Sequence, residues 1–251
     1  MGITVSTLEH FLELKRRHNS VFFGHVLQLG RQDTFINIDT FKQVFMKWGT
    51  AIPDNFDFEY RENPWLNGQK TVSDISFFKA LGFEVVSSLD FVDNEDPTIV
   101  FDLNQELPDH LKNNFDFIYN GGTIEHVFDI CQAFRNIHYM LKPGGVIVHE
   151  CPMHNYVDHG FWQISPTAIL DAYTVNQYQE LLTIILSTNR QSMHQGPYER
   201  YSYDPTQFES LSVGGHGSYM MLTFSSLQKP LSSLNWKIPT QGFYNKYWKL
   251  K

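Results

Sequence analysis

The hydrophobic and polar positions follow two periods over roughly the first 150 residues. Short apolar runs predict strands at 26–30, 83–89, 98–103, 115–119 and 146–149. Apolar residues at every third or fourth position predict helices at 8–14, 35–48, 72–81 and 123–141. Strands that alternate with helices on short connections predict a mostly parallel sheet covered on both faces. The expected fold class is therefore α/β and doubly wound.

The rest of the chain follows these periods less closely. Residues 49–70 are rich in Pro, Asn, Asp, Gly and aromatic residues without a clean period, which predicts an inserted loop or lid. Beyond residue 152 we expect a helix around 165–187, a glycine- and tyrosine-rich loop, and a strand at 219–225. At 251 residues, the chain has a suitable length for a single domain over 1–251.

Composition narrows the choice of partner and compartment. The net charge of −8 argues against nucleic acid, whose binding depends on neutralising phosphates. Cys131 and Cys151 lie inside predicted regular elements and form no disulfide framework, which favours a reducing compartment. The first residues lack the apolar core of a signal peptide, and no run of about 18 uncharged apolar residues is present. We therefore expect a cytoplasmic protein without a membrane partner; the pattern indicates no particular oligomeric state.

Two predicted strands end in carboxylates, at the edge where open parallel sheets bind ligands. Asp90 can accept hydrogen bonds from both hydroxyls of a ribose. On the next strand, Asp102 can accept from an exocyclic amine, and the backbone N–H of Leu103 can donate to a ring nitrogen. For either acid alone, a helix cap or a solvated loop is the more common role. Together, on consecutive strands, they predict a nucleoside site.

Residues 115–152 carry the most specific motifs, FDFIYNGGTIEHVFD and NIHYMLKPGGVIVHECP. They resemble the second half of the class I S-adenosylmethionine-dependent methyltransferases, where a strand, a Glu-His helix start, LKPGG and an apolar strand follow in this order. The resemblance extends upstream through Asp90 and Asp102, and covers about residues 21–152. It implies a Rossmann-like methyltransferase fold with a seven-stranded, mainly parallel sheet and one antiparallel strand near its edge. It also implies S-adenosyl-L-methionine as cofactor and methyl transfer by direct in-line displacement.

The turn after the first strand departs from the family pattern, which usually reads GxGxG. Here it reads Gly30-Arg31-Gln32-Asp33, with one glycine only. A degenerate, non-catalytic domain is one interpretation. The other is that Arg31 binds the carboxylate of S-adenosylmethionine bidentately in place of backbone donors, although an arginine there can also pair with a nearby acid or face water. Gly30, Arg31 and Gln32 are therefore candidate cofactor ligands.

Asn120, Gly121 and Gly122 follow the fourth strand. Glycines there allow close approach of the backbone to a ligand, so these residues are expected to line the methionine arm and the departing methyl group. An ordinary tight turn is the alternative. By the resemblance, His126 at the start of the next helix is expected to order this turn and contact the cofactor rather than transfer a proton.

Acceptor specificity is expected from residues 151–217, beginning with CPMHNYVDHGFWQ directly after the fifth strand. For a hydroxyl acceptor, His159 is the preferred general base and His154 the second choice. The walls of the acceptor pocket are predicted to be Asn155, Tyr156, Phe161, Trp162 and Gln163.

Two further histidine arrangements are weaker. His154, Asp158 and His159 could together bind a metal, but their spacing matches no recognised ligand signature, so no metal is expected. His216, which lies among the glycines of Val213-Gly214-Gly215-His216-Gly217, is another loop candidate.

The expected function is methylation of a small polar molecule, such as a sugar or secondary metabolite, at oxygen or nitrogen. One alternative is a non-catalytic S-adenosylmethionine-binding or degenerate Rossmann-like binding module, which the missing glycines would suit. Another is a nicotinamide- or sugar-nucleotide-dependent enzyme, which would need a glycine-rich pyrophosphate turn after the first strand.

Overall fold

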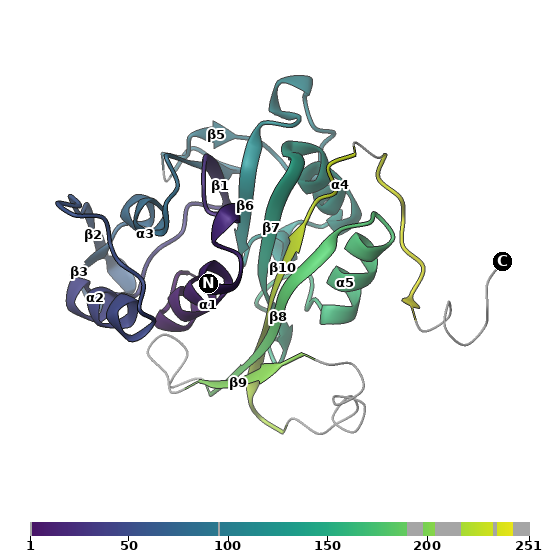
Figure 1. Cartoon of the computed structure of the whole chain (residues 1–251). Helices are drawn as coiled ribbons and strands as arrows, with labels where there is room; N and C mark the ends of the chain where they lie inside the picture. Colours follow the sequence, from purple (N-terminus) through teal and green to yellow (C-terminus); the bar gives the residue numbers. More distant parts are fainter. Residues whose placement is uncertain (1, 95, 190–197, 204–216, 233–234, 243–251) are drawn as a thin grey trace.

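A computed structural model describes residues 2–94, 96–189, 198–203, 217–232 and 235–242, and its centre is an eight-stranded sheet (Figure 1). The order across the sheet is β5-β4-β1-β6-β7-β10-β8-β9. In chain order the strands are β1 (His25–Leu29), β4 (Val85–Asp90), β5 (Ile99–Val100), β6 (Phe115–Gly121), β7 (Leu141–His154), β8 (Gln179–Thr188), β9 (Glu199–Ser202) and β10 (Met220–Gln228). The first five in spatial order are parallel, whereas β10 is antiparallel to β7 and β8. The mostly parallel, Rossmann-like sheet is confirmed; its eighth strand is β9, which adds to the edge beyond β8.

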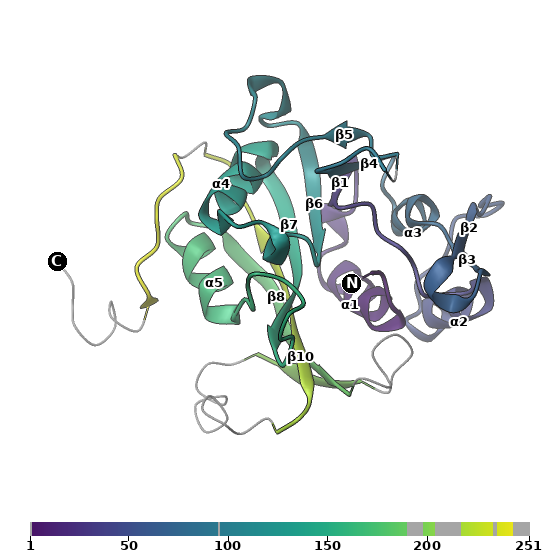
Figure 2. The same ribbon diagram turned by 180° about the vertical axis from the view of Figure 1, so that it is seen from behind.

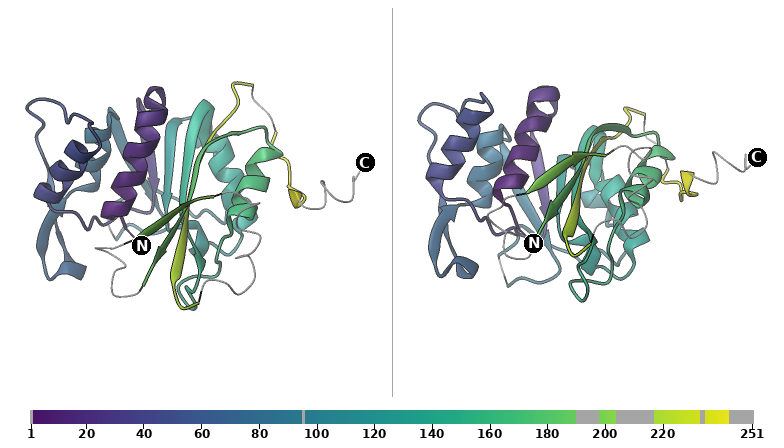
Figure 3. Two further views of the ribbon diagram at one scale, coloured as in Figure 1. Left: turned by 60° about the horizontal axis from the view of Figure 1, so that its bottom comes forward. Right: turned by 90° about the horizontal axis from the view of Figure 1, so that it is seen from below.

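Helices cover both faces of this sheet, as Figures 1 and 2 show from opposite sides. The helices α1 (Val5–Arg17), α2 (Ile38–Lys47) and α3 (Asp74–Leu81) lie on one face, and α4 (Ile130–Met140) and α5 (Pro166–Thr174) lie on the other. Each interface holds its own apolar core. Phe11 of α1 packs edge-on against Phe77 of α3 on one side, and Phe134 of α4 packs against Tyr173 of α5 on the other. The views in Figure 3 show the resulting three layers.

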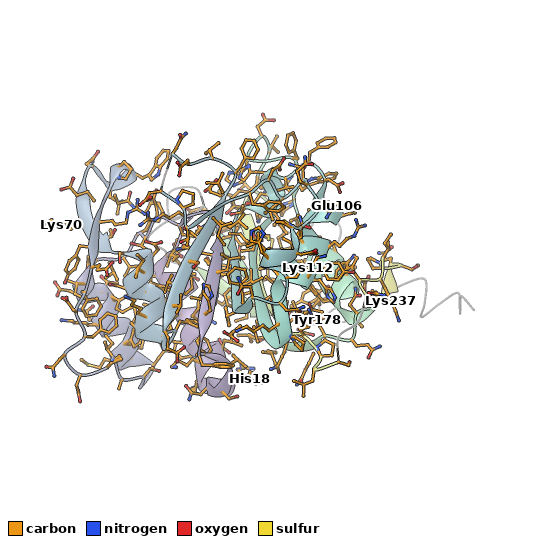
Figure 4. All side chains as sticks on the ribbon, turned by 90° about the horizontal axis from the view of Figure 1, so that it is seen from above. His18, Lys70, Glu106, Lys112, Tyr178 and Lys237 are labelled. Carbon is orange, nitrogen blue, oxygen red and sulfur yellow. The ribbon has the colours of Figure 1, made fainter. Side chains whose placement is uncertain are left out.

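The segment predicted as a lid contains a small hairpin. Strands β2 (Tyr60–Asn63) and β3 (Gln69–Val72) pair antiparallel around the 3₁₀ turn η2 (Pro64–Leu66). Asn63 caps this turn by accepting from the N–H of Trp65 at 2.8 Å. The hairpin lies beside α2 and α3 (Figure 1). Lys70, on the hairpin, and Lys237, near the end of the described chain, lie on opposite sides of the molecule (Figure 4).

The prediction of a helix around 165–187 is wrong for the second half of that range. The helix α5 ends at Thr174, and β8 occupies Gln179–Thr188. Its sequence, QELLTIILST, has an apolar centre and is rich in β-branched residues, and it pairs with β10 on one side and β9 on the other. The strand expected at 219–225 is confirmed as β10.

Three other boundaries also differ from expectation. The helix expected at 123–141 begins as the 3₁₀ turn η4 (Ile124–His126), and α4 starts only after Asp129, which accepts from the N–H of Gln132 at 2.9 Å. The strand expected at 98–103 is reduced to β5, and β7 is much longer than the run 146–149 from which it was predicted. Short 3₁₀ turns η1 (Asn19–Val21) and η3 (Asp109–Leu111) complete the elements of the described residues.

The chain order creates a point where the strand order reverses. From β1 it continues to β4 and β5 on one side, and then returns to β6 and β7 on the other. The carboxyl ends of β1 and β6 therefore lie side by side, and Thr123 joins them by donating to the carbonyl of Leu29 at 2.6 Å. Such a point is where open α/β sheets bind ligands. Among the described residues, no helix combines the length and apolarity that a membrane span requires.

Candidate active site

A cavity of about 540 Å³ opens at this reversal point. Its walls come from the turns that follow β1, β4, β5 and β6, together with Trp65 of the hairpin. Eight of the predicted cofactor ligands line it: Gly30, Arg31, Gln32, Asp90, Asp102, Leu103, Gly122 and His126. The strand ends that the sequence singled out thus border one space, large enough for an adenosyl group.

The two carboxylates differ in how they are held. Asp90 is half-buried, and its Oδ1 accepts one hydrogen bond, from the N–H of Phe91 at 2.7 Å. Asp102 closes its own turn by accepting from the N–H of Asn104 at 2.9 Å and from the side chain of Gln105 at 3.3 Å. These hydrogen bonds lower the pKa of Asp102, and the bond from the backbone of Asn104 has the largest effect. Both acids are therefore available as hydrogen-bond acceptors at the cavity wall.

The turn after β1 is built with one glycine and two side chains. Gly30 has a φ of +69°, and a Cβ there would lie 2.7 Å from the hydroxyl of Thr123. The side chain of Gln32 is buried and donates to the carbonyls of Leu29 at 3.0 Å and Gly30 at 3.1 Å. Gln32 thus shapes the turn through hydrogen bonds to the backbone, while part of the residue also lines the cavity.

Arg31 lines the cavity and also lies next to acids. Its Nε is 3.7 Å from the buried carboxylate of Asp74, and its Nη1 donates to the carbonyl of Asp96 at 3.0 Å. Arg61 approaches the other oxygen of Asp74 at 3.8 Å. The acid pairing foreseen as the alternative is therefore present. Binding of a cofactor carboxylate by Arg31 remains a prediction.

Of the three residues at the end of β6, only Gly122 borders the cavity. Asn120 is fully buried, and its Oδ1 accepts from the N–H groups of Thr123 at 3.2 Å and Ile124 at 3.1 Å. A Cβ at Gly121 would lie 2.6 Å from the ring of Tyr119. Asn120 and Gly121 therefore shape the turn beneath the cavity, and Gly122, with a φ of +87°, presents its backbone to it.

A buried carboxylate lies directly behind the cavity wall. The side chain of Glu125 is fully buried, and neither of its oxygens accepts a hydrogen bond from any residue that the structure describes. Its Oε1 is 3.6 Å from Nε2 of His159 and 4.0 Å from Nε2 of His126. The two imidazole rings are 5.0 Å apart. We call these three residues the Glu125 cluster.

The members of this cluster come from both halves of the site. His126 lines the cofactor cavity, and partial burial lowers its pKa although Glu125 opposes the shift. His159 belongs to the segment that follows β7, and its Nε2 is buried without a hydrogen-bond partner in the described chain. Glu125 was missing from the predicted site residues, although it is the acid of the EHV motif. Its burial beneath a distant segment could not be read from the sequence.

The predicted acceptor residues divide between several positions. Tyr156 is buried, its ring lies 5.5 Å from His159, and its hydroxyl has no hydrogen-bond partner among the described residues. His154 lies within β7 opposite Met221 of β10 and does not border the cofactor cavity. Asn155 is exposed and donates to the carbonyl of Tyr219 at 2.9 Å. Of these residues, only Tyr156 and His159 thus lie beside the side chains of the Glu125 cluster. His216 is outside the described residues.

The remaining predicted acceptor residues lie farther along this segment. Phe161 stacks edge-on against Phe128 at 5.3 Å, and Trp162 donates to the carbonyl of Val127 at 3.0 Å. Trp162 and Gln163 line a second, mainly apolar cavity of about 520 Å³ between α4, α5 and residues 236–241. Since Val127 also lines the cofactor cavity, Trp162 lies at the wall between the two spaces.

Comparison with known proteins identifies the family of this chain. A family model described as a methyltransferase domain matches residues 44–205, more than half of the chain. No curated protein matches the sequence significantly. Among solved structures, the chain is similar to an S-adenosylmethionine-dependent methyltransferase from Mesorhizobium loti, with 14% identity, a TM-score of 0.42 and coverage of 90% of this chain and 100% of that one. It is also similar to one from Archaeoglobus fulgidus, with 10% identity, a TM-score of 0.42 and coverage of 88% and 94%. On the family match, the chain belongs to the class I S-adenosylmethionine-dependent methyltransferases and is an enzyme that uses S-adenosylmethionine as its cofactor.

Proposed function

We propose that this enzyme methylates an oxygen or nitrogen atom of a small polar molecule, such as a sugar or secondary metabolite. The observation that carries the proposal is the position of the Glu125 cluster, a carboxylate and two imidazoles, behind the wall of the cofactor cavity. Carboxylates and imidazoles are the groups that help to remove a proton from an acceptor. The net charge of −8 also favours a small acceptor over a nucleic acid.

In this proposal the cavity residues hold the cofactor through its polar groups. Asp90 accepts from the ribose hydroxyls, and Asp102 accepts from the exocyclic amine of the adenine. Gly30 and Gly122 leave room for close approach of the backbone, and Arg31 binds the methionine carboxylate. The sulfonium supplies an electrophilic methyl group, so the protein mainly has to align the acceptor with it.

The acceptor is proposed to bind on the His159 side of the cavity, against Tyr156. Because His126 lines the cofactor cavity and its ring lies 5.0 Å from that of His159, an acceptor there is close to both imidazoles. His159 then takes the acceptor proton, and Glu125 at 3.6 Å stabilises the imidazolium that forms. His154 remains the second choice as base, although its place in β7 makes it the weaker candidate.

The test is an assay of methyl transfer to a metabolite extract that has been separated by molecular mass into a low-mass and a macromolecular fraction. Each fraction is assayed with and without a chelator, so that any dependence on a metal ion is recorded. Wild-type protein should convert S-adenosylmethionine to S-adenosylhomocysteine with the low-mass fraction and add one methylene to a product in the mass spectrum. His159→Asn should lower kcat by about 100-fold or more without changing the cofactor Kd. His110→Asn, a surface histidine on η3, is the matched control. Transfer to the macromolecular fraction alone would contradict a small acceptor, and full activity of His159→Asn would contradict the base.

A further inference from the structure

The burial of Glu125 requires a physical explanation. An ionised carboxylate without a partner in the interior is destabilising by several kcal/mol, unless it takes up a proton or a cation neutralises it. No hydrogen-bond donor among the described residues reaches either oxygen, and no described Lys or Arg forms an ion pair with it. Two imidazole nitrogens, Nε2 of His159 and Nε2 of His126, lie 3.6 and 4.0 Å from the same oxygen, Oε1. The arrangement is three electron-pair donors around one point.

Main-chain contacts hold these donors together. Glu125 and His126 are consecutive on η4, and His159 arrives from the segment after β7. That segment is docked on η4: the N–H of Trp162 donates to the carbonyl of Glu125 at 3.2 Å, and a Cβ at Gly160 would lie 2.8 Å from the same carbonyl. The close approach of His159 to Glu125 thus depends on a glycine as its neighbour.

We propose that Glu125, His126 and His159 bind one divalent transition-metal ion, such as Zn²⁺ or Mn²⁺. The three donor atoms lie within 4.8 Å of one another. Donors around a tetrahedral Zn²⁺ lie about 3.3 Å apart, so closure needs shifts of roughly 1 Å, which the half-exposed His126 can make. Two imidazoles and one carboxylate suit first-row transition ions better than Mg²⁺ or Ca²⁺, which prefer oxygen ligands.

This site differs from the metal arrangement considered from the sequence. That arrangement combined His159 with His154 and Asp158, and no metal was expected. Within the described chain, His154 and Asp158 do not join His159 in a group of possible ligands, whereas Glu125 and His126 do. Three protein ligands leave coordination positions open, as in catalytic rather than structural metal sites.

The chemical consequence rests on the proposed function, because it needs the acceptor to reach the cluster. An acceptor hydroxyl bound to the ion has a lowered pKa and releases its proton to water. Its oxygen then forms a bond to the methyl carbon as the carbon–sulfur bond breaks, which leaves S-adenosylhomocysteine. With the ion bound, His159 is a ligand, and the ion replaces it as the group that promotes loss of the proton.

Metal binding can be measured without any acceptor. Chelator-treated wild-type protein, titrated calorimetrically with Zn²⁺ and separately with Mn²⁺, should take up one equivalent of ion. Glu125→Gln and His159→Asn should each weaken binding by at least about tenfold, while His110→Asn should bind as the wild type does. An unchanged S-adenosylmethionine Kd in every variant shows that the domain is folded.

X-ray absorption of the Zn²⁺-loaded wild type decides the question even if the buried Glu125→Gln variant does not fold, because it should show two imidazoles and one carboxylate. Absence of binding by the wild type, or wild-type affinity in Glu125→Gln, would overturn the proposal. The proposed function fails separately. If the protein binds the ion but transfers no methyl group to any low-mass acceptor, the metal site is supported and the proposed function is contradicted. If the protein binds no ion but methylates a low-mass acceptor in the presence of a chelator, the proposed function is supported and the metal site is contradicted.

Discussion

Replacing Asp90 with alanine should weaken the binding of S-adenosylmethionine by about two orders of magnitude. Asp90 ends β4 beside the β1 turn, where the N–H of Gly30 donates to the carbonyl of Leu89 at 2.7 Å. A carboxylate has about four lone-pair positions, and one accepts from the N–H of Phe91. Enough positions therefore remain for both ribose hydroxyls.

The magnitude follows from the charge and exposure of this acid. A hydrogen bond to a charged group contributes about 1.5–3 kcal/mol. Because Asp90 is only half-buried, we take the lower value for each of the two bonds, which gives about 3 kcal/mol, or about 150-fold in Kd. Asp90→Asn keeps one acceptor oxygen and should lose about tenfold.

Calorimetry with S-adenosylmethionine and S-adenosylhomocysteine measures both effects. Asp93→Asn removes an exposed acid from the same segment that does not border the cavity, and should leave both Kd values unchanged. Thermal unfolding of each variant checks that loss of the bond to Phe91 has not displaced the segment. A Kd for Asp90→Ala within twofold of the wild type would refute the reasoning, because the ribose would then lie elsewhere.

Two further predictions concern charged groups around the sheet. Arg31→Ala should raise the cofactor Kd, measured by calorimetry, at least tenfold, which is about 1.4 kcal/mol. Arg61→Ala is its control, since both arginines lie near Asp74 but only Arg31 lines the cofactor cavity. Equal effects of the two substitutions would contradict direct binding by Arg31. Burial raises the pKa of Glu150 from 4.5 to about 7, so this acid binds its proton more tightly in the folded state. Its contribution to stability is therefore fully present below pH 4.5 and is lost as the pH rises to 7. Glu150→Gln should abolish this part of the pH dependence, up to about 3 kcal/mol in urea unfolding between pH 5 and 8, and an unchanged slope would show that the shift is absent.

The parallel half of the fold follows from local patterns, whereas the antiparallel half does not. Strands such as Phe115–Gly121 are buried on both faces and lie next to helices with one apolar stripe, so each element shows its own period. Residues 181–186, LLTIIL, form a short and almost uninterrupted apolar run, and periodicity alone does not distinguish such a run from part of a buried helix. Pairing with β9 and β10, which follow later in the chain, decides it.

The same division applies to the site. Asp90, Asp102 and Gly122 converge because parallel strands place their carboxyl ends at one edge, a consequence of the fold class itself. His154 was expected in a loop because the apolar run that predicted β7 stops well before the strand does. The approach of His159 to Glu125 depends on how the segment after β7 docks on η4. That docking is a tertiary contact, and the residues that flank Glu125 and His159 in the sequence do not indicate it.

The missing glycines after β1 therefore need not indicate lost cofactor binding. A glycine-rich turn lets the backbone bend sharply and approach its ligand, and here the bend needs a positive φ only at Gly30. The amide of Gln32 satisfies the carbonyls of the turn, and Thr123 links it to the neighbouring strand, so side chains do the work that further glycines would do. Since S-adenosylmethionine has no phosphate to cradle, such a turn loses little as a binding element. It also places Arg31 at the cavity wall, where a carboxylate of the cofactor can reach it.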